Sequence, residues 1–192
     1  MRQIIVSERI TLDGFITRPD GAMDWMEPYF DEALAKYEAD LQKTVDTALF
    51  GRVTYQGFAS YWPTVPSDPA SPRGVVEYAN QFNTMRKVVF SRTLSRAEWS
   101  NSAVINEIDP EVITSMKREP GRDIVIFGSA SVVQTLTRYG LIDVYNLLIY
   151  PIILGEGKPL FHNLEHMMNL KLVSAKTHPS GVVEISYHRT LE

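Results

Sequence analysis

The sequence contains no cysteine, and this absence removes several kinds of chemistry. A disulfide framework, a thiolate nucleophile and a cysteine-ligated metal site all require that residue. Long apolar runs are also missing, since no segment approaches the ~20 residues that a membrane-spanning helix needs. The amino-terminal stretch MRQIIVSERI lacks the extended apolar region of a signal peptide. We therefore expect a cytoplasmic protein that has no membrane partner.

Basic residues are not in excess. The chain has 19 Lys and Arg against 23 Asp and Glu, for a net charge of -4. A nucleic-acid-binding surface usually needs a concentrated basic face, so we expect no nucleic-acid partner. His162 and His166 are spaced as an i,i+4 pair without a grouping of acids, which favours no metal site. A chain of 192 residues, 44% of them hydrophobic, predicts one domain over residues 1–192.

Apolar runs alternate with helical patterns along the chain. This alternation predicts an α/β fold of three layers, with a mostly parallel central sheet between helices. Ser180-Gly181 lies between the last two apolar runs and predicts an antiparallel hairpin at one edge of the sheet. The expected strands span 3–10, 47–50, 87–90, 103–105, 124–127, 144–153, 170–175 and 182–187, and the expected helices span 30–45, 54–61, 75–82, 110–117 and the segment from 132.

The longest expected helix is recognised by an apolar stripe with helical spacing. Pro28 suits its first turn, and Asp31 lies at the edge of the stripe, between core and solvent. The stripe consists of Phe30, Leu34, Tyr37, Leu41 and Val45.

Two strand ends attract attention because a glycine follows the strand and a helix begins at once. The first is Gly51, followed by Arg52 and Thr54; the second is Gly128, followed by Ser129. Unpaired backbone N–H groups at a helix N-terminus favour anions, and glycine lets a phosphate approach the backbone.

A third candidate site is Ser91-Arg92, which also follows a strand. Ligands of open α/β sheets bind beyond the carboxyl ends of the strands, where all three sites would lie. The alternative interpretation is that these glycines only form turns and that the Ser and Thr residues only cap helices. Neither glycine junction matches a standard nucleotide-binding fingerprint.

In order and spacing, these segments resemble the dihydrofolate reductase superfamily. Residues 50–55 (FGRVTY) resemble its Gly-Arg-x-Thr-aromatic segment, and residues 124–131 (IVIFGSAS) resemble the strand that ends in a glycine-rich turn. Residues 12–16 (LDGFI) and 151–161 (PIILGEGKPLF) are more similar to a sister branch, which contains the reductase domain of bacterial riboflavin biosynthesis and stand-alone relatives. The resemblance extends from about residue 3 to about residue 188.

The resemblance implies NADPH as cofactor and hydride transfer to a pterin-like or aminopyrimidinone-like small molecule. It assigns Arg52 and Thr54, beside Gly51, to the cofactor phosphates, and Ser91 and Arg92 to the 2′-phosphate. A guanidinium suits a phosphate dianion, which favours NADPH over NADH. The pyrophosphate would lie on Gly128, Ser129, Ala130, Ser131 and Val132, and Ile16 and Trp25 would flank the nicotinamide.

The proton donor is less well marked. Dihydrofolate reductases use a carboxylate on the first helix, a few residues after a tryptophan, and Asp31 after Trp25 matches this loosely. A half-buried acid beside the substrate could have a raised pKa and donate a proton. An ordinary solvated acid in a first helical turn is the alternative. Glu27 and Glu32 are rival candidates.

Two further alternatives concern the class of protein. The chain could be a true dihydrofolate reductase, although the usual arginine for the glutamate of folate has no match. It could also be a noncatalytic NADPH-binding module. Finally, the apolar run 145–154 and the carboxy-terminal strands predict a homodimer, since such strands offer an edge for pairing.

Overall fold

The computed structural model describes residues 1–190, and one sheet of eight strands organises them. The strand order is β5-β4-β3-β6-β1-β7-β10-β9. The pairings from β5 to β7 are parallel, and those of β10 with β7 and β9 are antiparallel. The strands are β1 (Ile4–Thr11), β3 (Val45–Gly51), β4 (Arg86–Phe90), β5 (Ser102–Ile105), β6 (Asp123–Ile126), β7 (Val144–Tyr150), β9 (Leu170–Thr177) and β10 (Val183–Arg189).

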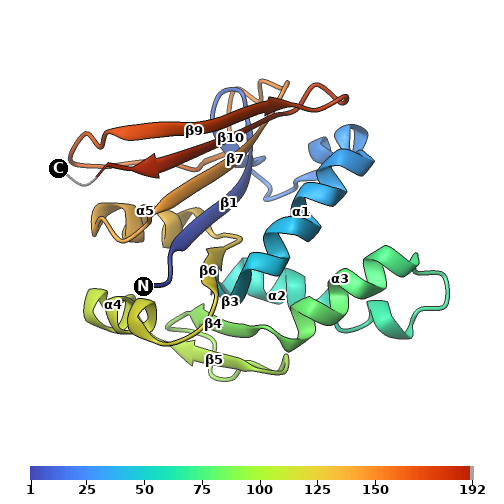
Figure 1. Ribbon diagram of the computed structural model, residues 1–192, viewed down its shortest axis with the longest axis horizontal. Coiled ribbons are helices and arrows are strands. Elements are labelled where there is room, and N and C mark those ends of the chain that lie inside the picture. The colour runs from blue at the N-terminus through green and yellow to red at the C-terminus, as the bar shows by residue number, and fades with distance from the viewer. Residues whose placement is uncertain (191–192) are drawn as a thin grey trace.

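Helices cover both faces of this sheet (Figure 1). On one face, α1 (Glu32–Thr44), α2 (Arg52–Tyr61) and α3 (Arg73–Thr84) contribute Leu41, Tyr55 and Phe82 to a core cluster. On the other face, α4 (Pro110–Arg118) and α5 (Ala130–Arg138) pack side chains such as Ile113 and Leu136 against β1 and β6. The predicted three-layer α/β arrangement and the antiparallel carboxy-terminal hairpin are therefore confirmed.

Two short elements were not expected as strands. β2 (Phe15–Thr17) and β8 (Lys158–Pro159) form a separate antiparallel pair. A strand of two or three residues has too little periodicity to be recognised from sequence. The pair joins the turn after β1 to the loop after β7, and so fixes the segment that carries Ile16.

The expected start of the first long helix is wrong. Residues Asp24–Tyr29 form a separate 3₁₀ helix, η1, with Pro28 inside it, and α1 begins only after Asp31. Phe30 lies between the two helices and its side chain is 64% exposed, so it does not belong to the buried stripe. Val45 is the first residue of β3. Another 3₁₀ helix, η2 (Val65–Ser67), interrupts the proline-rich loop.

Of the segments expected to offer an edge for pairing, the apolar run that begins at residue 145 does not do so, whereas a carboxy-terminal strand does. β7 pairs with β1 on one side and with β10 on the other, so its backbone groups are already used. The edge on this side is β9, whose side chains are mostly exposed.

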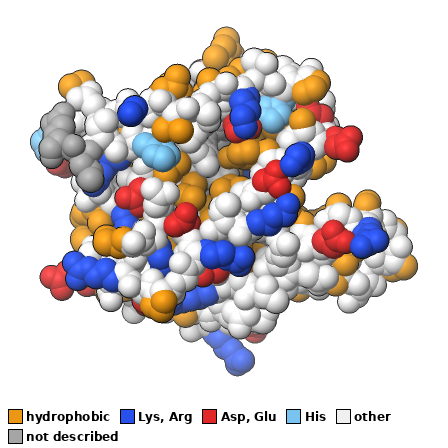
Figure 2. Space-filling model, in the orientation of Figure 1, with side chains coloured by type: hydrophobic (Ala, Val, Ile, Leu, Met, Phe, Trp, Pro, Cys, Tyr) orange, Lys and Arg blue, Asp and Glu red, His pale blue; other side chains and the backbone are white. Residues whose placement is uncertain are grey.

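Charges are mixed on the face shown in Figure 2, where acidic and basic side chains alternate along α1. Lys36 and Lys43 both bond to Asp40, at 2.6 and 2.8 Å.

Among the described residues, no helix has the length and apolar character that a bilayer crossing requires.

Candidate functional site

Parallel pairing brings the three predicted strand ends together. β3 lies between β4 and β6, and Gly51 is directly opposite Phe90, the residue before Ser91. The backbone N–H of Gly51 donates to the carbonyl of Gly128 at 3.2 Å. We call the residues of these three strand ends the junction cluster: Gly51, Arg52, Thr54, Ser91, Arg92 and 128–132.

The two glycines of the junction cluster are required by close packing. A Cβ on Gly51 would lie 2.2 Å from Oγ of Ser129. Gly128 has φ +113°, and a Cβ there would lie 2.9 Å from Oγ1 of Thr54. The Gly128–Ser129 peptide bond is cis. A side chain at either position would fill the space where the two helix N-termini meet, so glycine keeps the backbone accessible.

The helices that begin in the junction cluster leave their first N–H groups free of side-chain caps. Neither Gly51, before α2, nor Ser129, before α5, makes a side-chain capping bond. By contrast, Asp31 caps α1 and Asp109 caps α4. Two uncapped N-termini side by side place positive dipole ends and unpaired donors at one point, which suits an anion.

Two exposed arginines flank this point. The guanidinium of Arg52 bonds only to Gln56, at 3.0 Å, and neither it nor Arg92 forms an ion pair within residues 1–190. Ser91 is buried, and its hydroxyl accepts from the N–H groups of Thr93 and Leu94 at 3.2 and 2.9 Å. Ser91 therefore shapes the loop that presents Arg92.

The other residues predicted to bind cofactor have different surroundings. The side chains of Ala130 and Val132 are buried in the core, and Val132 N–H already donates to the carbonyl of Ser129. Ala130 therefore offers a ligand only backbone groups, whereas Ser131 also has an exposed hydroxyl, 2.8 Å from that of Ser129. Ile16 packs in the core cluster on the α5 face, whereas Trp25 packs edge-on against Tyr150 on the α1 face.

Asp31 does not have the raised pKa that was expected of a proton donor. Its carboxylate accepts from the backbone N–H of Leu34 at 2.8 Å and of Ser180 at 3.1 Å. These bonds favour the charged form and lower the pKa of Asp31. The geometry is that of a helix N-cap that also holds the β9–β10 turn. Of the rival candidates, Glu27 lies in η1 and Glu32 in the first turn of α1, and both are exposed.

Glu8, a buried acid in β1, was not among the residues predicted from the sequence. Burial raises its pKa to about 8, which the nearby Arg9 guanidinium only partly counteracts. Its Oε1 atom has no hydrogen-bond partner within the described residues. The signal was available, because Ser7-Glu8-Arg9 interrupts an otherwise apolar strand. Charged residues are almost never fully buried without a partner, so such an interruption indicates a special role.

Polar groups also gather between α1 and the strands it covers. Ser7 of β1 is directly opposite Asn146 of β7, and the hydroxyl of Tyr37 on α1 is close to both. Neither that hydroxyl nor Oδ1 of Asn146 has a hydrogen-bond partner of normal geometry among residues 1–190. Burial raises the pKa of Tyr37 to about 12, so it is a neutral donor. Next to them, Arg9 forms an ion pair with Glu38.

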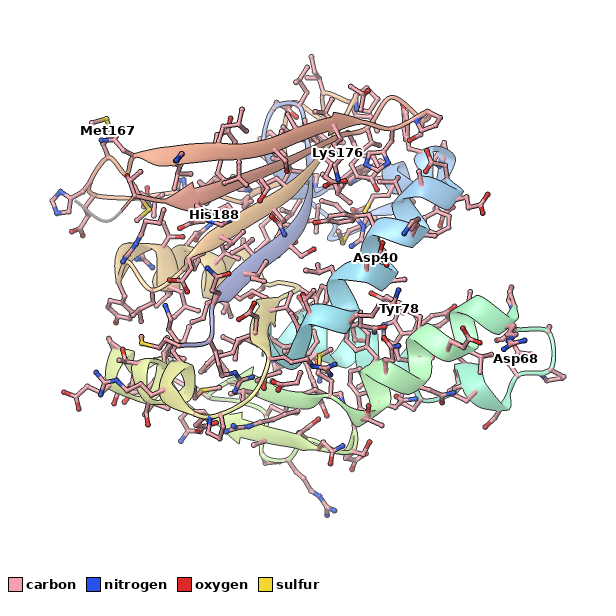
Figure 3. The ribbon with its side chains drawn as sticks, viewed as in Figure 1. Asp40, Asp68, Tyr78, Met167, Lys176 and His188 are labelled. Carbon is pink, nitrogen blue, oxygen red and sulfur yellow. The ribbon has the colours of Figure 1, made fainter. Side chains whose placement is uncertain are left out.

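The same face continues toward α3. The side-chain amide of Gln42 donates to the carbonyl of Tyr78 at 3.1 Å, and Figure 3 shows Tyr78 of α3 close to α1, below Asp40. The Oε1 atom of Gln42 has no partner in the described part of the chain. Polar atoms that lack partners at several positions on one face indicate a place where water or a polar ligand completes the hydrogen bonding.

A cavity of about 750 Å³ lies beside α2. Its lining includes the aromatic residues Tyr55 and Trp99 and the oppositely charged Arg96 and Glu98. None of its lining residues belongs to the junction cluster. Over the described residues, no group of three or more His, Asp or Glu side chains is placed to hold a metal ion.

Comparison with known proteins gives a consistent result. The model of the RibD C-terminal domain family matches residues 2–184. The uncharacterized protein YyaP of Bacillus subtilis (strain 168) is 38% identical over 190 residues, which cover 97% of this chain and 95% of YyaP.

Solved structures share the fold. A putative riboflavin biosynthesis protein from Shewanella sp. PV-4 superposes with a TM-score of 0.75 at 21% identity, covering 98% of this chain and 99% of that one. Dihydrofolate reductase from Enterococcus faecalis, complexed with NADP(H) and RAB-propyl, has a TM-score of 0.61 at 16% identity, covering 97% and 96%. The fold expected from the sequence resemblance is confirmed.

Proposed function

Because the chain belongs to the RibD C-terminal domain family, we propose that it is an NADPH-dependent reductase that acts on a pterin-like or aminopyrimidinone-like small molecule. The observation that carries this proposal is the contact between Gly51 and Gly128, which places two uncapped helix N-termini at one point. The aminopyrimidinone reductase of the riboflavin pathway is the activity we favour. A true dihydrofolate reductase is the alternative within the same reaction class.

The junction cluster fits a phosphorylated dinucleotide. The backbone N–H groups at Gly128–Ser131 would receive the pyrophosphate, because a Cβ at Gly51 or Gly128 would fill that space. Arg52 and Thr54 would contact cofactor phosphates, and the exposed Arg92 would reach the 2′-phosphate. Bound NADPH supplies the hydride. Ile16 and Trp25 remain our candidates for the nicotinamide end.

The substrate would lie against the α1 face. Tyr37 offers a neutral hydroxyl and Asn146 an amide oxygen, and both atoms are buried without a hydrogen-bond partner of normal geometry among the described residues. A heterocycle with ring nitrogens and a carbonyl group presents the matching donors and acceptors. Asp31 stays the predicted proton donor from the sequence, although its N-cap bonds favour a structural role.

Titration of the protein with NADPH, followed by fluorescence, tests the cofactor half of the proposal. We expect saturable binding at micromolar concentration and oxidation of bound NADPH by one member of a panel of aminopyrimidinones, pterins and dihydrofolate. Binding with no turnover across the panel would favour a noncatalytic NADPH-binding module. No binding at millimolar NADPH would refute both the reductase and the noncatalytic NADPH-binding module.

We also propose a homodimer that forms through β9. This strand is one of the two edges of the sheet, and its residues Leu172 and Val173 are 50% and 54% exposed. Met167, just before the strand, is 89% exposed and projects beyond it (Figure 3). Light scattering at micromolar concentration should give twice the mass of one chain. Leu172→Lys should give the monomer, because a charge on an edge strand opposes pairing.

The single-domain organisation and the cytoplasmic location expected from the sequence stay predictions. Limited proteolysis that released a stable fragment would contradict the first, and recovery of the protein outside the cytoplasm would contradict the second.

A further inference from the structure

Glu8 stands out among the buried side chains because the described residues compensate its carboxyl only in part. The residue is 6% exposed, and its neighbours on the same face of β1 are Val6 and Ile10, both in the apolar core. Its Oε1 atom is buried without a hydrogen-bond partner in residues 1–190. A carboxyl in such a position is costly unless it is protonated or meets a ligand.

The carboxyl lies directly beneath the junction cluster. A Cβ built on Gly128 would be 3.4 Å from Oε1 of Glu8 and 2.9 Å from Oγ1 of Thr54. Glu8 and Thr54 therefore converge on Gly128 from two different elements, β1 and α2. The carboxyl lies where the pyrophosphate end of the cofactor is proposed to bind.

The surroundings supply almost no charge to offset an ionised carboxylate. On its own strand, Arg9 is the next residue, and it is held by Glu38 of α1 in an ion pair. The elements packed around the carboxyl present uncharged groups: Thr54 of α2, Gly128 after β6, and Leu147 of β7 opposite Glu8 in register. Burial accordingly raises the pKa of Glu8 to about 8.

We propose that Glu8 is a cofactor-contacting residue, whose protonated carboxyl donates a hydrogen bond to an oxygen of the dinucleotide bound at Gly128. This inference rests on the proposed function. A protonated carboxyl offers one O–H donor, which an anionic phosphate or a ribose hydroxyl accepts. An ionised Glu8 would instead repel the phosphates at short range in a buried site.

The proposal makes binding depend on pH in a definite direction. If only the protonated form of Glu8 binds, the apparent affinity is reduced by the fraction of protein that has lost this proton. With a pKa of about 8, the affinity is constant at acidic pH and falls as pH rises above 8. The expected dissociation constant at pH 9.5 is roughly 30-fold higher than at pH 6.5.

The test measures NADPH and NADH dissociation constants between pH 6.5 and 9.5 for the wild type, Glu8→Gln and Glu184→Gln. Glutamine keeps an uncharged donor, so Glu8→Gln should bind as the wild type does at pH 6.5 and show no loss at pH 9.5. Glu184 is also buried but pairs with His178, and its variant should keep the wild-type pH profile. NADH serves as the ligand without a titrating 2′-phosphate.

The possible results separate the two claims. An identical pH profile in the wild type and Glu8→Gln would overturn the role of Glu8 and leave the proposed function standing. Failure of the wild type to bind either dinucleotide at pH 6.5 would refute the proposed function first. If Glu8→Gln does not fold, the carboxyl ¹³C resonance of Glu8 in the wild type decides. Its pKa should rise on adding NADPH, and an unchanged or lowered value would refute the contact.

Discussion

Replacing Gly128 with alanine is expected to abolish dinucleotide binding and to lower the free energy of unfolding by about 2–4 kcal/mol. At φ +113° an alanine is strained, and its Cβ would lie 2.9 Å from Oγ1 and 3.3 Å from Cγ2 of Thr54. Oγ1 and Cγ2 are the two branches on Cβ of Thr54, so rotating this side chain exchanges one contact for the other. The neighbouring Tyr55 is buried in the core and holds α2 in place, so we expect the turn at Gly128 to shift instead. Urea unfolding and NADPH titration measure the two effects.

Gly181→Ala is the matched control for Gly128→Ala. Gly181 also has a positive φ, +88°, but its nearest atom to a new Cβ is Cγ of Pro151 at 3.7 Å, an ordinary contact. The Gly181→Ala variant therefore has a strained backbone without a steric clash. Its free energy of unfolding should fall by about 1–2 kcal/mol, while dinucleotide binding is retained. If Gly128→Ala bound NADPH as tightly as Gly181→Ala does, the junction cluster would not be the cofactor site.

The two strand-glycine-helix junctions were predictable because their signals are local. A buried strand that ends in glycine before a helix is visible within a few residues, as at Gly51 and Gly128. Their contact is a property of the sheet order, which places β3 beside β6 although β4, β5 and three α-helices intervene in the chain. A local sequence pattern could not predict that β3 and β6 are neighbours. The resemblance of the whole chain to a known family predicted it.

The surroundings of Asp31 and Glu8 were not predictable because they depend on contacts between distant segments. Asp31 accepts from Leu34 of its own helix and also from Ser180 of the β9–β10 turn, and these bonds lower a pKa that its position in the sequence suggested was raised. Glu8 is buried because β6 and β7 flank β1 on both sides. Likewise, the apolar run that begins at residue 145 is explained by the interior position of β7 in the sheet. Hydrophobicity alone does not distinguish a strand in the interior of a sheet from a strand at a subunit interface.

Selectivity between the two nicotinamide dinucleotides gives the second large effect. We expect Arg52→Ala and Arg92→Ala each to weaken NADPH binding by roughly 10–100-fold and NADH binding by less. A charge-assisted hydrogen bond contributes about 1.5–3 kcal/mol, and 1.4 kcal/mol corresponds to tenfold in affinity. Both arginines are exposed and without ion pairs in the described structure, so neither has to break an ion pair in order to bind a phosphate. Parallel NADPH and NADH titrations measure it.

Arg73→Ala controls for the general loss of a positive charge. The side chain of Arg73 is 92% exposed on α3 and bonds to Glu77, and surface pairs of this kind contribute little. This variant should bind both dinucleotides as the wild type does. Salt separates the effects further, because phosphate contacts made by exposed arginines weaken with ionic strength. Equal losses of NADPH and NADH binding in Arg92→Ala would show that Arg92 does not contact the 2′-phosphate. The predicted preference for NADPH over NADH would then lack its residue at the end of β4.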